Sequence, residues 1–475
     1  MCGICLVVGR DKAARPSAAE LCSEILFKLQ HRGQEGAKIY AADGDAVTTL
    51  GGYGMVSQMI DTGQLAAISG TRAIGQVRYA TYGPSQAQNI QPFKMATRDG
   101  SLIFAHNGQF GSPDEIEAQR AALMSRGFAF HSDTDSELFG GQFALSGARD
   151  LAGRLRDGFR QNIGSAAVVG MIGDTGFAGR RVGNRPLFMA EIEDGGMVFA
   201  SEDYMLRELV VRGNRVRFSK IRECPPGTIF VWQDGELSTH PIWESEFESR
   251  FCLFELFYFS HPLSTFHGVY LSRLRRGFGG ALAEKAPAEA DLVASVPDSG
   301  NSAAEGYAEA SGLPRRSAVT RDHYITRTFI GGAQAERTEG AGRKYNIDRS
   351  LVDGKSVVIV DDSLVRGTTL TRLVRRLRAA GAARIHLRIA SPPIRYPSYD
   401  GTNIRSQDEL IAAGMRPPEI ARRLGADSLA YLPLENAYAV IGDLTETGRE
   451  HGNFCDAIFT GEYWHRVGTD AHPHR

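Results

Sequence analysis

Two apolar stretches in the second half of the chain end abruptly in polar residues. The β-branched run from Val357 to Val360 stops at two carboxylates, Asp361 and Asp362. The stretch from Leu292 to Val296 stops at the polar loop 297–300. Buried parallel strands are apolar on both faces, and they deliver polar side chains to the carboxyl edge of the sheet, where ligands bind. The pattern therefore predicts two strands of one α/β domain with a binding edge.

Helical spacing follows each of these strands. Two sets of residues fall on single helix faces, namely Leu370, Leu373, Val374 and Leu377, and Ala303, Ala304, Tyr307 and Ala308. Gly381 suits the end of the first helix. A strand, a small loop and a helix N-terminus together present backbone N–H groups and a positive dipole end, which favours phosphate. For Asp361 and Asp362 alone, a plain strand-turn-helix with capping aspartates is the alternative.

Further patterns divide the chain into parts. Leu102 to Ala105 reads as an apolar strand that Asn107 and Gly108 follow, and Ile385, Leu387 and Ile389 alternate as another strand. The apolar stretch Phe251–Ser260 opens a second domain. We expect one domain over residues 2–240, a second over 241–463, and a mobile tail over 464–475.

Composition narrows the function classes. The chain has 475 residues and a formal net charge of -1, so no global field draws it to nucleic acid or to an acidic membrane. No stretch approaches the roughly 18 apolar residues of a membrane span, and the apolar start is too short for a signal peptide. The six scattered cysteines are too few for a disulfide framework. These features predict a cytoplasmic protein with reduced cysteines.

Cys2 follows the initiator Met1, and its small side chain permits removal of the methionine. The free α-amine would have an ordinary pKa of roughly 7.7 to 8.0, so it can act as general base for the thiol of the same residue. From Cys2 alone, a cysteine that has no role is the favoured interpretation. Its context changes that balance.

The segments around Cys2 resemble the class II glutamine amidotransferase domain. MCGI, HRGQEGA (31–37), GQVRYATYG (75–83), AHNGQ (105–109) and SDTDSE (132–137) occur in the order of that family. The resemblance implies an N-terminal-nucleophile αββα sandwich with Cys2 as nucleophile and with Asn107 and Gly108 as the oxyanion hole. It also implies that Arg78 holds the α-carboxylate of glutamine and Asp135 the α-ammonium, roles that suit a guanidinium and a carboxylate.

The stretch VDDSLVRGTT (360–369) resembles the 5-phosphoribosyl-1-pyrophosphate (PRPP) loop of type I phosphoribosyltransferases, in its amidophosphoribosyltransferase version. The resemblance implies a second α/β domain with a mainly parallel sheet. Mg²⁺ would be held by Ser299, Asp361 and Asp362. The PRPP-binding residues would be Asp361, Asp362, Ser363, Arg366, Gly367, Thr368 and Thr369, with Arg327 and Lys344 from a polar loop, residues 323–347.

Several positions depart from the family pattern. His261 and Leu263 stand where the family has arginine and aspartate, Thr326 replaces a glycine, and residues 340–342 are less basic than usual. Gln76 and Lys38 replace a histidine and a glycine. Some members bind a four-iron cluster, but here Ser398 and Ile458 occupy two of the cysteine positions. Because Cys252 and Cys455 cannot supply four ligands, we expect no iron–sulfur cluster.

The resemblance covers residues 2 to about 463 and implies one two-step reaction. Cys2 would release ammonia from glutamine, and ammonia would displace pyrophosphate from Mg²⁺-bound PRPP to give 5-phosphoribosylamine, the first step of purine synthesis. The substrates would be small molecules, with no nucleic-acid or membrane partner, and a homo-oligomer is expected. The alternatives are a paralogue in specialised metabolism that aminates another phosphorylated sugar, motivated by His261 and Leu263, and a non-catalytic PRPP sensor.

Overall fold

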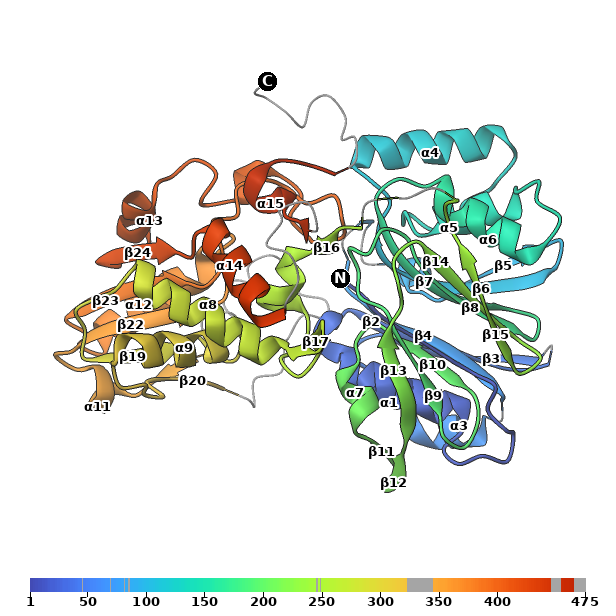
Figure 1. Cartoon of the computed structure of the whole chain (residues 1–475), viewed down its shortest axis with the longest axis horizontal. Helices are drawn as coiled ribbons and strands as arrows, with labels where there is room; N and C mark the ends of the chain where they lie inside the picture. Colours follow the sequence, from blue (N-terminus) through green and yellow to red (C-terminus); the bar gives the residue numbers. More distant parts are fainter. Residues whose placement is uncertain are drawn as a thin grey trace.

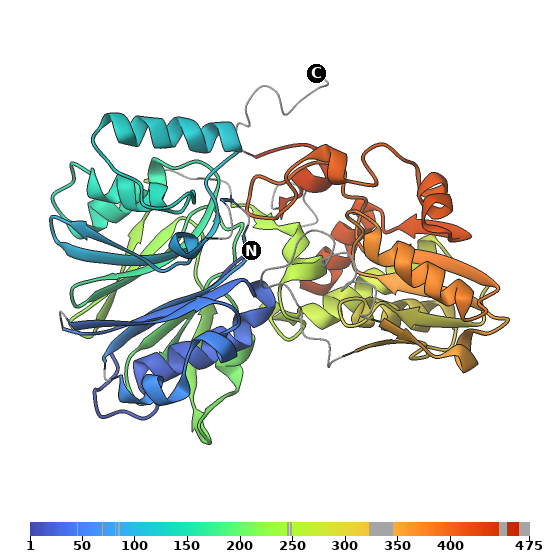
Figure 2. The same cartoon turned by 180° about the vertical axis from the view of Figure 1, so that it is seen from behind.

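The chain forms two halves that lie side by side, with the N-terminus between them (Figure 1). The reverse view shows the same arrangement (Figure 2). The computed structural model describes residues 1–322, 345–445 and 454–464, apart from positions 45, 69, 81, 84, 85, 245, 246 and 248. The expected tail, except for Trp464, and most of the expected loop 323–347 lie outside the described residues. None of the described helices is long and apolar enough to cross a membrane.

The N-terminal half contains two antiparallel sheets. The seven-stranded sheet has the order β13 (Phe218–Glu223), β9 (Phe188–Ile192), β10 (Met197–Ala200), β1 (Gly3–Val8), β4 (Arg72–Arg78), β2 (Gly36–Asp43) and β3 (Ala46–Tyr53). The six-stranded sheet has the order β15 (Glu236–Pro241), β14 (Thr228–Gln233), β8 (Thr175–Arg180), β7 (Ser165–Ile172), β6 (Gly100–Gln109) and β5 (Phe93–Thr97). This is the expected αββα sandwich.

The alternation of side chains along each strand explains how the sheets and helices pack in layers. On β1, Ile4, Leu6 and Val8 pack into the cluster between the two sheets, whereas Cys5 and Val7 pack with the outer helix α1 (Ala18–Lys28). The outer face of the second sheet is covered by α5 (Glu137–Ala144) and α6 (Leu151–Arg160). Helix α4 (Pro113–Ser125) packs beside α5. Because side chains alternate between the faces of a strand, one apolar strand serves two cores.

The C-terminal half is built on a four-stranded parallel sheet. Its order is β19 (Leu292–Ser295), β22 (Ser356–Asp361), β23 (Arg384–Ile389) and β24 (Ser428–Tyr431). One face is covered by α8 (Leu271–Lys285), α9 (Asn301–Ser311) and α14 (Leu434–Thr445), the other by α12 (Thr368–Ala379) and α13 (Pro417–Leu424). The predicted strands and the apolar faces of α9 and α12 are confirmed, since all eight predicted helix residues are buried.

The first apolar stretch of the second half does not form one regular element. Phe251–Cys252 is strand β16, which pairs in parallel with β25 (Phe454–Cys455), and Glu255–Phe259 forms the π-helical turn η3. The structure also extends the predicted strand at Leu102, because β6 continues to Gln109. Asn107 and Gly108 therefore lie inside a strand rather than after it. Their backbone is fixed by pairing with Ala167 and Ala166 of β7.

Candidate active sites

The predicted nucleophile lies at the start of β1, beside the end of β4. Cys2 is partly buried, and its Sγ lies 3.7 Å from the backbone oxygen of Tyr79. Its backbone N–H donates to Oδ1 of Asn107 at 3.2 Å, and its carbonyl accepts from Nε of Arg32 at 3.0 Å. Cys2 is thus held by Asn107 and Arg32 through its backbone, while its thiol lies beside Tyr79 at the carboxyl end of β4.

Asn107 leaves one donor free in this place. Its Oδ1 is used by Cys2, while its Nδ2 is buried and has no hydrogen-bond partner among the described residues. A buried polar atom without a partner is costly, so such an atom marks a place where a ligand completes the bonding. Gly108 has φ of +149°, and a Cβ there would lie 2.1 Å from the carbonyl oxygen of Ser165. Glycine is therefore required next to this donor.

Arg78 and Asp135 are both buried in the N-terminal half. Arg78 is the last residue of β4, donates to the carbonyl of Asn89, and lies 3.7 Å from the carboxylate of Glu35. Asp135 accepts the backbone N–H of Phe110 at 2.8 Å. Burial raises the pKa of the Asp135 carboxyl to about 6, against the opposing effect of that N–H and of the Arg78 charge. One cation and one titratable anion are thus placed near Cys2 and Asn107.

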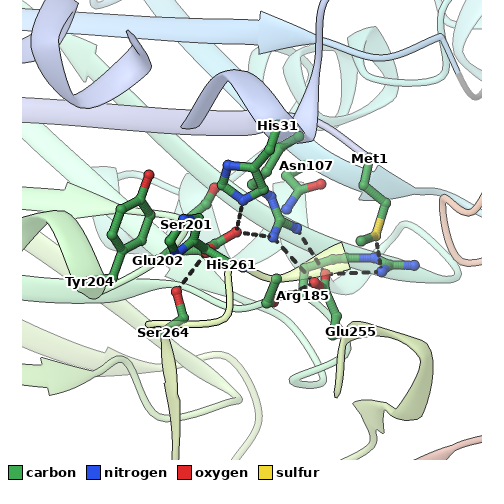
Figure 3. A network of polar contacts seen from close by, with 12 residues as sticks. Met1, His31, Asn107, Arg185, Ser201, Glu202, Tyr204, Glu255, His261 and Ser264 are labelled. Atoms are coloured by element: carbon green, nitrogen blue, oxygen red, sulfur yellow. Dashed lines mark hydrogen bonds and ion pairs between the residues drawn. The ribbon is translucent and has the colours of Figure 1, made fainter. Parts of the chain in front are cut away.

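A network of buried charges joins the two halves beside Cys2 (Figure 3). Arg32 donates to Glu202 at 2.7 Å and to Glu255 at 2.8 Å, so it ties the carbonyl of Cys2 to both halves. Glu202 also accepts from the backbone of His261 at 2.8 Å and from Ser264 Oγ at 2.6 Å. Burial alone would raise the pKa of Glu202, but His31 and Arg32 hold it far below its ordinary range.

Sequence reasoning missed most of this network. Arg32 stood inside the HRGQEGA motif but received no role, and Glu202 and Glu255 were not considered. The available signal was Glu255 inside the apolar stretch 251–260, because charged residues are rarely buried without a partner. Glu255 pairs with Arg32 of the other half, and Glu202 pairs with Arg32 across 170 positions, so neither pairing could be read from spacing.

The acceptor side of the chain contains the predicted phosphoribosyl residues. Asp361 ends β22 and Asp362 follows it, and both are buried. Ser299 and Asp362 line one pocket, together with Arg275 of α8 and Ala390 after β23. The structure therefore brings the two predicted anion loops to the same edge of the sheet. Ser363 Oγ donates to the carboxylate of Asp362 at 2.5 Å.

The rest of the predicted loop leads into α12. Gly367 has φ of +79° and precedes the helix, and Thr368 and Thr369 are exposed in its first turn. Arg366 is exposed and forms an ion pair with Glu409. The two threonines of the first turn are thus accessible at a helix N-terminus, as an anion site requires. Arg327 and Lys344 lie outside the described residues.

His261, expected on the acceptor side, packs against the N-terminal half instead. Its ring stacks on Tyr204 with centroids 4.0 Å apart and lies 5.5 Å from the ring of His31. Burial, together with the His31 charge, lowers the pKa of His261 to about 4. The substitution at this position is therefore accommodated by a contact between the halves. Leu263, two residues on, is 54% exposed.

The side chains at the two candidate metal positions fit Mg²⁺ but not an iron–sulfur cluster. Asp361, Asp362 and Ser299 offer hard oxygen ligands, which fit Mg²⁺ held by one or two carboxylates and completed by substrate phosphates. The iron–sulfur position does not fit a four-thiolate cluster. Cys252 and Cys455 pair in register, but Ser398 and the buried side chain of Ile458 occupy the other positions. The absence of a cluster stays a prediction.

The fold and the two sites define a class of protein, in which an N-terminal-nucleophile sandwich is joined to a phosphoribosyltransferase domain. The family described as phosphoribosyl transferase domain matches residues 281–391. The chain is 37% identical over 462 residues to the chloroplastic amidophosphoribosyltransferase of Vigna aconitifolia, covering 97% of this chain and 91% of the relative. It is 35% identical over 467 residues to the amidophosphoribosyltransferase of Bacillus subtilis, covering 97% and 94%.

Two solved structures resemble the whole chain. The glutamine PRPP amidotransferase of Bacillus subtilis, complexed with ADP and GMP, has a TM-score of 0.87 and 34% identity over 99% of both chains. A structure described as the allosteric regulatory enzyme of purine biosynthesis has a TM-score of 0.88 and 34% identity, covering 99% and 97%. The chain belongs to the amidophosphoribosyltransferase family.

Proposed function

We propose that this chain is a glutamine-dependent amidotransferase that forms 5-phosphoribosylamine from PRPP. The observation that carries the proposal is the unpartnered, buried Nδ2 of Asn107, whose side chain also contacts the backbone of Cys2. A nucleophile beside a preorganised free donor is the arrangement that stabilises the oxyanion of acyl transfer. The family and its relatives support the same reaction.

The first half-reaction uses Cys2 after removal of Met1. The Met1 amino group is buried in the contact between the halves, and burial lowers its pKa to about 4. A free α-amine on Cys2, one residue further in, would lie in the same buried region and be held neutral, as a base must be. The amine takes the thiol proton, and the thiolate attacks the carboxamide carbon of glutamine.

The remaining groups have separate tasks in this proposal. Asn107 Nδ2 and the backbone N–H of Gly108 stabilise the oxyanion, while Arg78 and Asp135 hold the α-carboxylate and α-ammonium of the substrate. Ammonia leaves, and water releases glutamate from the thioester. Ammonia then attacks C1 of PRPP and displaces pyrophosphate.

In the second half-reaction the chain positions the substrate and does little acid–base chemistry. Asp361 and Asp362 would hold Mg²⁺, which supplies charge stabilisation for the leaving pyrophosphate. The first turn of α12 would bind the 5-phosphate with the backbone N–H groups and hydroxyls of Thr368 and Thr369. Arg327 and Lys344 stay predicted PRPP ligands. A cytoplasmic location and a homo-oligomeric state also stay predictions.

The deciding experiment measures glutamate and pyrophosphate in the same reaction, with glutamine, PRPP and Mg²⁺ present. We expect glutamate and pyrophosphate in equal amounts. Without a nitrogen donor, no pyrophosphate should form. The Cys2→Ala variant should release no glutamate. Glutamate release without pyrophosphate, whether or not PRPP is present, would contradict PRPP as acceptor. It would favour the paralogue that aminates another phosphorylated sugar. Failure to release glutamate would contradict the amidotransferase itself.

A further inference from the structure

One loop of the C-terminal half runs from the phosphoribosyl pocket to the oxyanion strand. The loop, residues 390–402, begins where the backbone N–H of Ala390 donates to the carbonyl of Asp361 at 2.9 Å, and Ala390 itself lines the pocket. Its far end, Asp400 and Gly401, lies against the N-terminal half. We call these two residues the Asp400–Gly401 corner.

Gly401 packs directly on the backbone of Gly108. A Cβ added to Gly401 would lie 2.8 Å from the carbonyl oxygen of Gly108, 2.9 Å from its carbonyl carbon and 3.2 Å from its Cα. Gly401 also has φ of +92°, which disfavours any side chain. The two glycines therefore meet backbone to backbone, and neither position has room for a methyl group.

The carbonyl of Asp400 is held by donors from the N-terminal half. It accepts from Ser165 Oγ at 2.9 Å and from Nε of Arg185 at 2.8 Å, and a second guanidinium nitrogen of Arg185 also donates to it. Arg185 and Ser165 are both fully buried. Bonds of a buried guanidinium to one carbonyl are strong and directional, so they fix the corner in place.

Ser165 connects this docking point to the oxyanion strand. Its own carbonyl oxygen is the atom that lies 2.1 Å from a Cβ on Gly108, and His106 Nε2 lies 3.3 Å from it. Because that oxygen can only accept, His106 carries its proton on Nε2, and burial lowers the pKa of His106 to about 3. Gly108 is thus enclosed by Ser165 on one side and by Gly401 on another.

The side chain of Asp400 ties the corner back to the C-terminal half. Its carboxylate accepts from Cys455 Sγ at 3.2 Å and from Trp464 Nε1 at 3.2 Å. The corner is therefore anchored on both sides of the contact between the halves, through its carbonyl and through its carboxylate.

We propose that the Asp400–Gly401 corner positions Gly108 in the oxyanion hole, so that the phosphoribosyltransferase domain completes the glutaminase site. The inference rests on the proposed function. Oxyanion donors act only when held close to their productive positions, and the backbone N–H of Gly108 is one bond away from the Cα that Gly401 contacts. The corner touches no substrate, so it is a positioning element and not a catalytic one.

The test replaces Gly401 with alanine in the full-length protein. Gly401→Ala displaces Gly108 and lowers kcat for glutamine hydrolysis by about 10²-fold, the effect of losing one oxyanion donor. The KM for glutamine stays within about twofold, because Arg78 and Asp135 are untouched. Glutamate γ-semialdehyde, which forms an oxyanion on Cys2, binds more weakly by the same factor as the loss in kcat. Product formation from added ammonia and PRPP is unchanged.

Gly354→Ala is the matched control. Gly354 also has a positive φ, of +70°, but nothing lies within 4 Å of a Cβ there, so it reports the backbone strain without the collision. Its kinetics are expected to equal those of the unaltered chain. An equal loss in both variants, or a Gly401→Ala variant that keeps its kcat for glutamine, overturns the proposal.

Ser165→Ala provides a second measurement that does not depend on Gly401→Ala folding. It removes one donor to the carbonyl of Asp400, and we expect kcat for glutamine to fall about fivefold with KM unchanged. No change in kcat overturns the proposal. Asn107→Ala separates this outcome from failure of the proposed function, because it must lower glutaminase activity wherever Asn107 forms the oxyanion hole. If Asn107→Ala has no effect, the proposed site is wrong and not merely its positioning.

Discussion

In the N-terminal site, Asn107 lies inside a ten-residue strand, with its backbone paired and its side chain fixed on Cys2. In the C-terminal site, Asp361 and Asp362 end a strand, and the threonines that follow are exposed. The first site holds a free donor ready for a charge that develops during reaction. The second offers carboxylates and backbone N–H groups that a metal-bound substrate completes.

The two sites differ because the two half-reactions need different kinds of stabilisation. Glutamine hydrolysis needs a nucleophile, a base and an oxyanion hole that are preorganised, because charge develops on a neutral amide. Displacement of pyrophosphate needs charge stabilisation of a leaving group that is already charged, so substrate and metal bring part of the site. The two sites are expected to respond to mutation in different ways.

The largest expected effect is that of Cys2→Ala. It removes the nucleophile, so glutamine-dependent product formation should fall by more than about 10³-fold. Product formation from added ammonia should persist, because the phosphoribosyl site is untouched. Both rates are measured by pyrophosphate release. Loss of the ammonia-dependent rate as well would show that the two sites are not separable as described.

Asp362→Asn tests the phosphoribosyl site and leaves the glutamine site unchanged. Removing one carboxylate weakens the metal site, so kcat/KM for PRPP should fall by roughly 10- to 100-fold and the Mg²⁺ concentration for half-maximal rate should rise. A Mg²⁺ titration with ammonia as nitrogen donor measures both. Asp353→Asn is the control, because Asp353 is exposed and forms an ion pair with Arg349. An unchanged Mg²⁺ titration would remove Asp362 from the site.

The pKa of Asp135 gives a pH test of the glutamine site. The carboxyl is protonated below about pH 6 and ionised above it, so binding of the α-ammonium strengthens as pH rises. Between pH 7 and pH 5, kcat/KM for glutamine should fall by about tenfold, with an inflection near 6. Asp135→Asn should lower kcat/KM and abolish that inflection. A profile with the same inflection in Asp135→Asn would assign it to another group.

The smallest effect is expected at His261. His261→Ala removes the stack on Tyr204, so the free energy of unfolding should fall by about 1 kcal/mol, or Tm by about 2 °C. Leu263→Ala, in the same loop but exposed, should leave Tm unchanged. The kcat/KM for PRPP should stay within about twofold in His261→Ala. A large loss there would place His261 in acceptor binding and revive the paralogue interpretation.

Sequence patterns predicted the regular parts of both halves because each rests on local periodicity. The strand at Val357, the apolar face of α12 and the alternation at Ile385 depend on neighbours three or four positions away at most, and all are confirmed. The irregular stretch at Phe251 could not be predicted in detail. It consists of a two-residue strand and a π-helical turn, which are too short to show a repeating pattern of apolar residues.

The sequence predicted the two folds, and it proposed a nucleophile and the residues of two anion loops, because these lie in short segments with recognisable chemistry. The way in which the halves meet is seen only in the folded structure. Three pairs of residues make contacts between the halves: Arg32 with Glu255, His261 with Tyr204, and Gly401 with Gly108. The two members of each pair lie at least 57 positions apart in the sequence. Such contacts depend on how two complete domains dock, and no local pattern of hydrophobic and polar residues encodes that geometry.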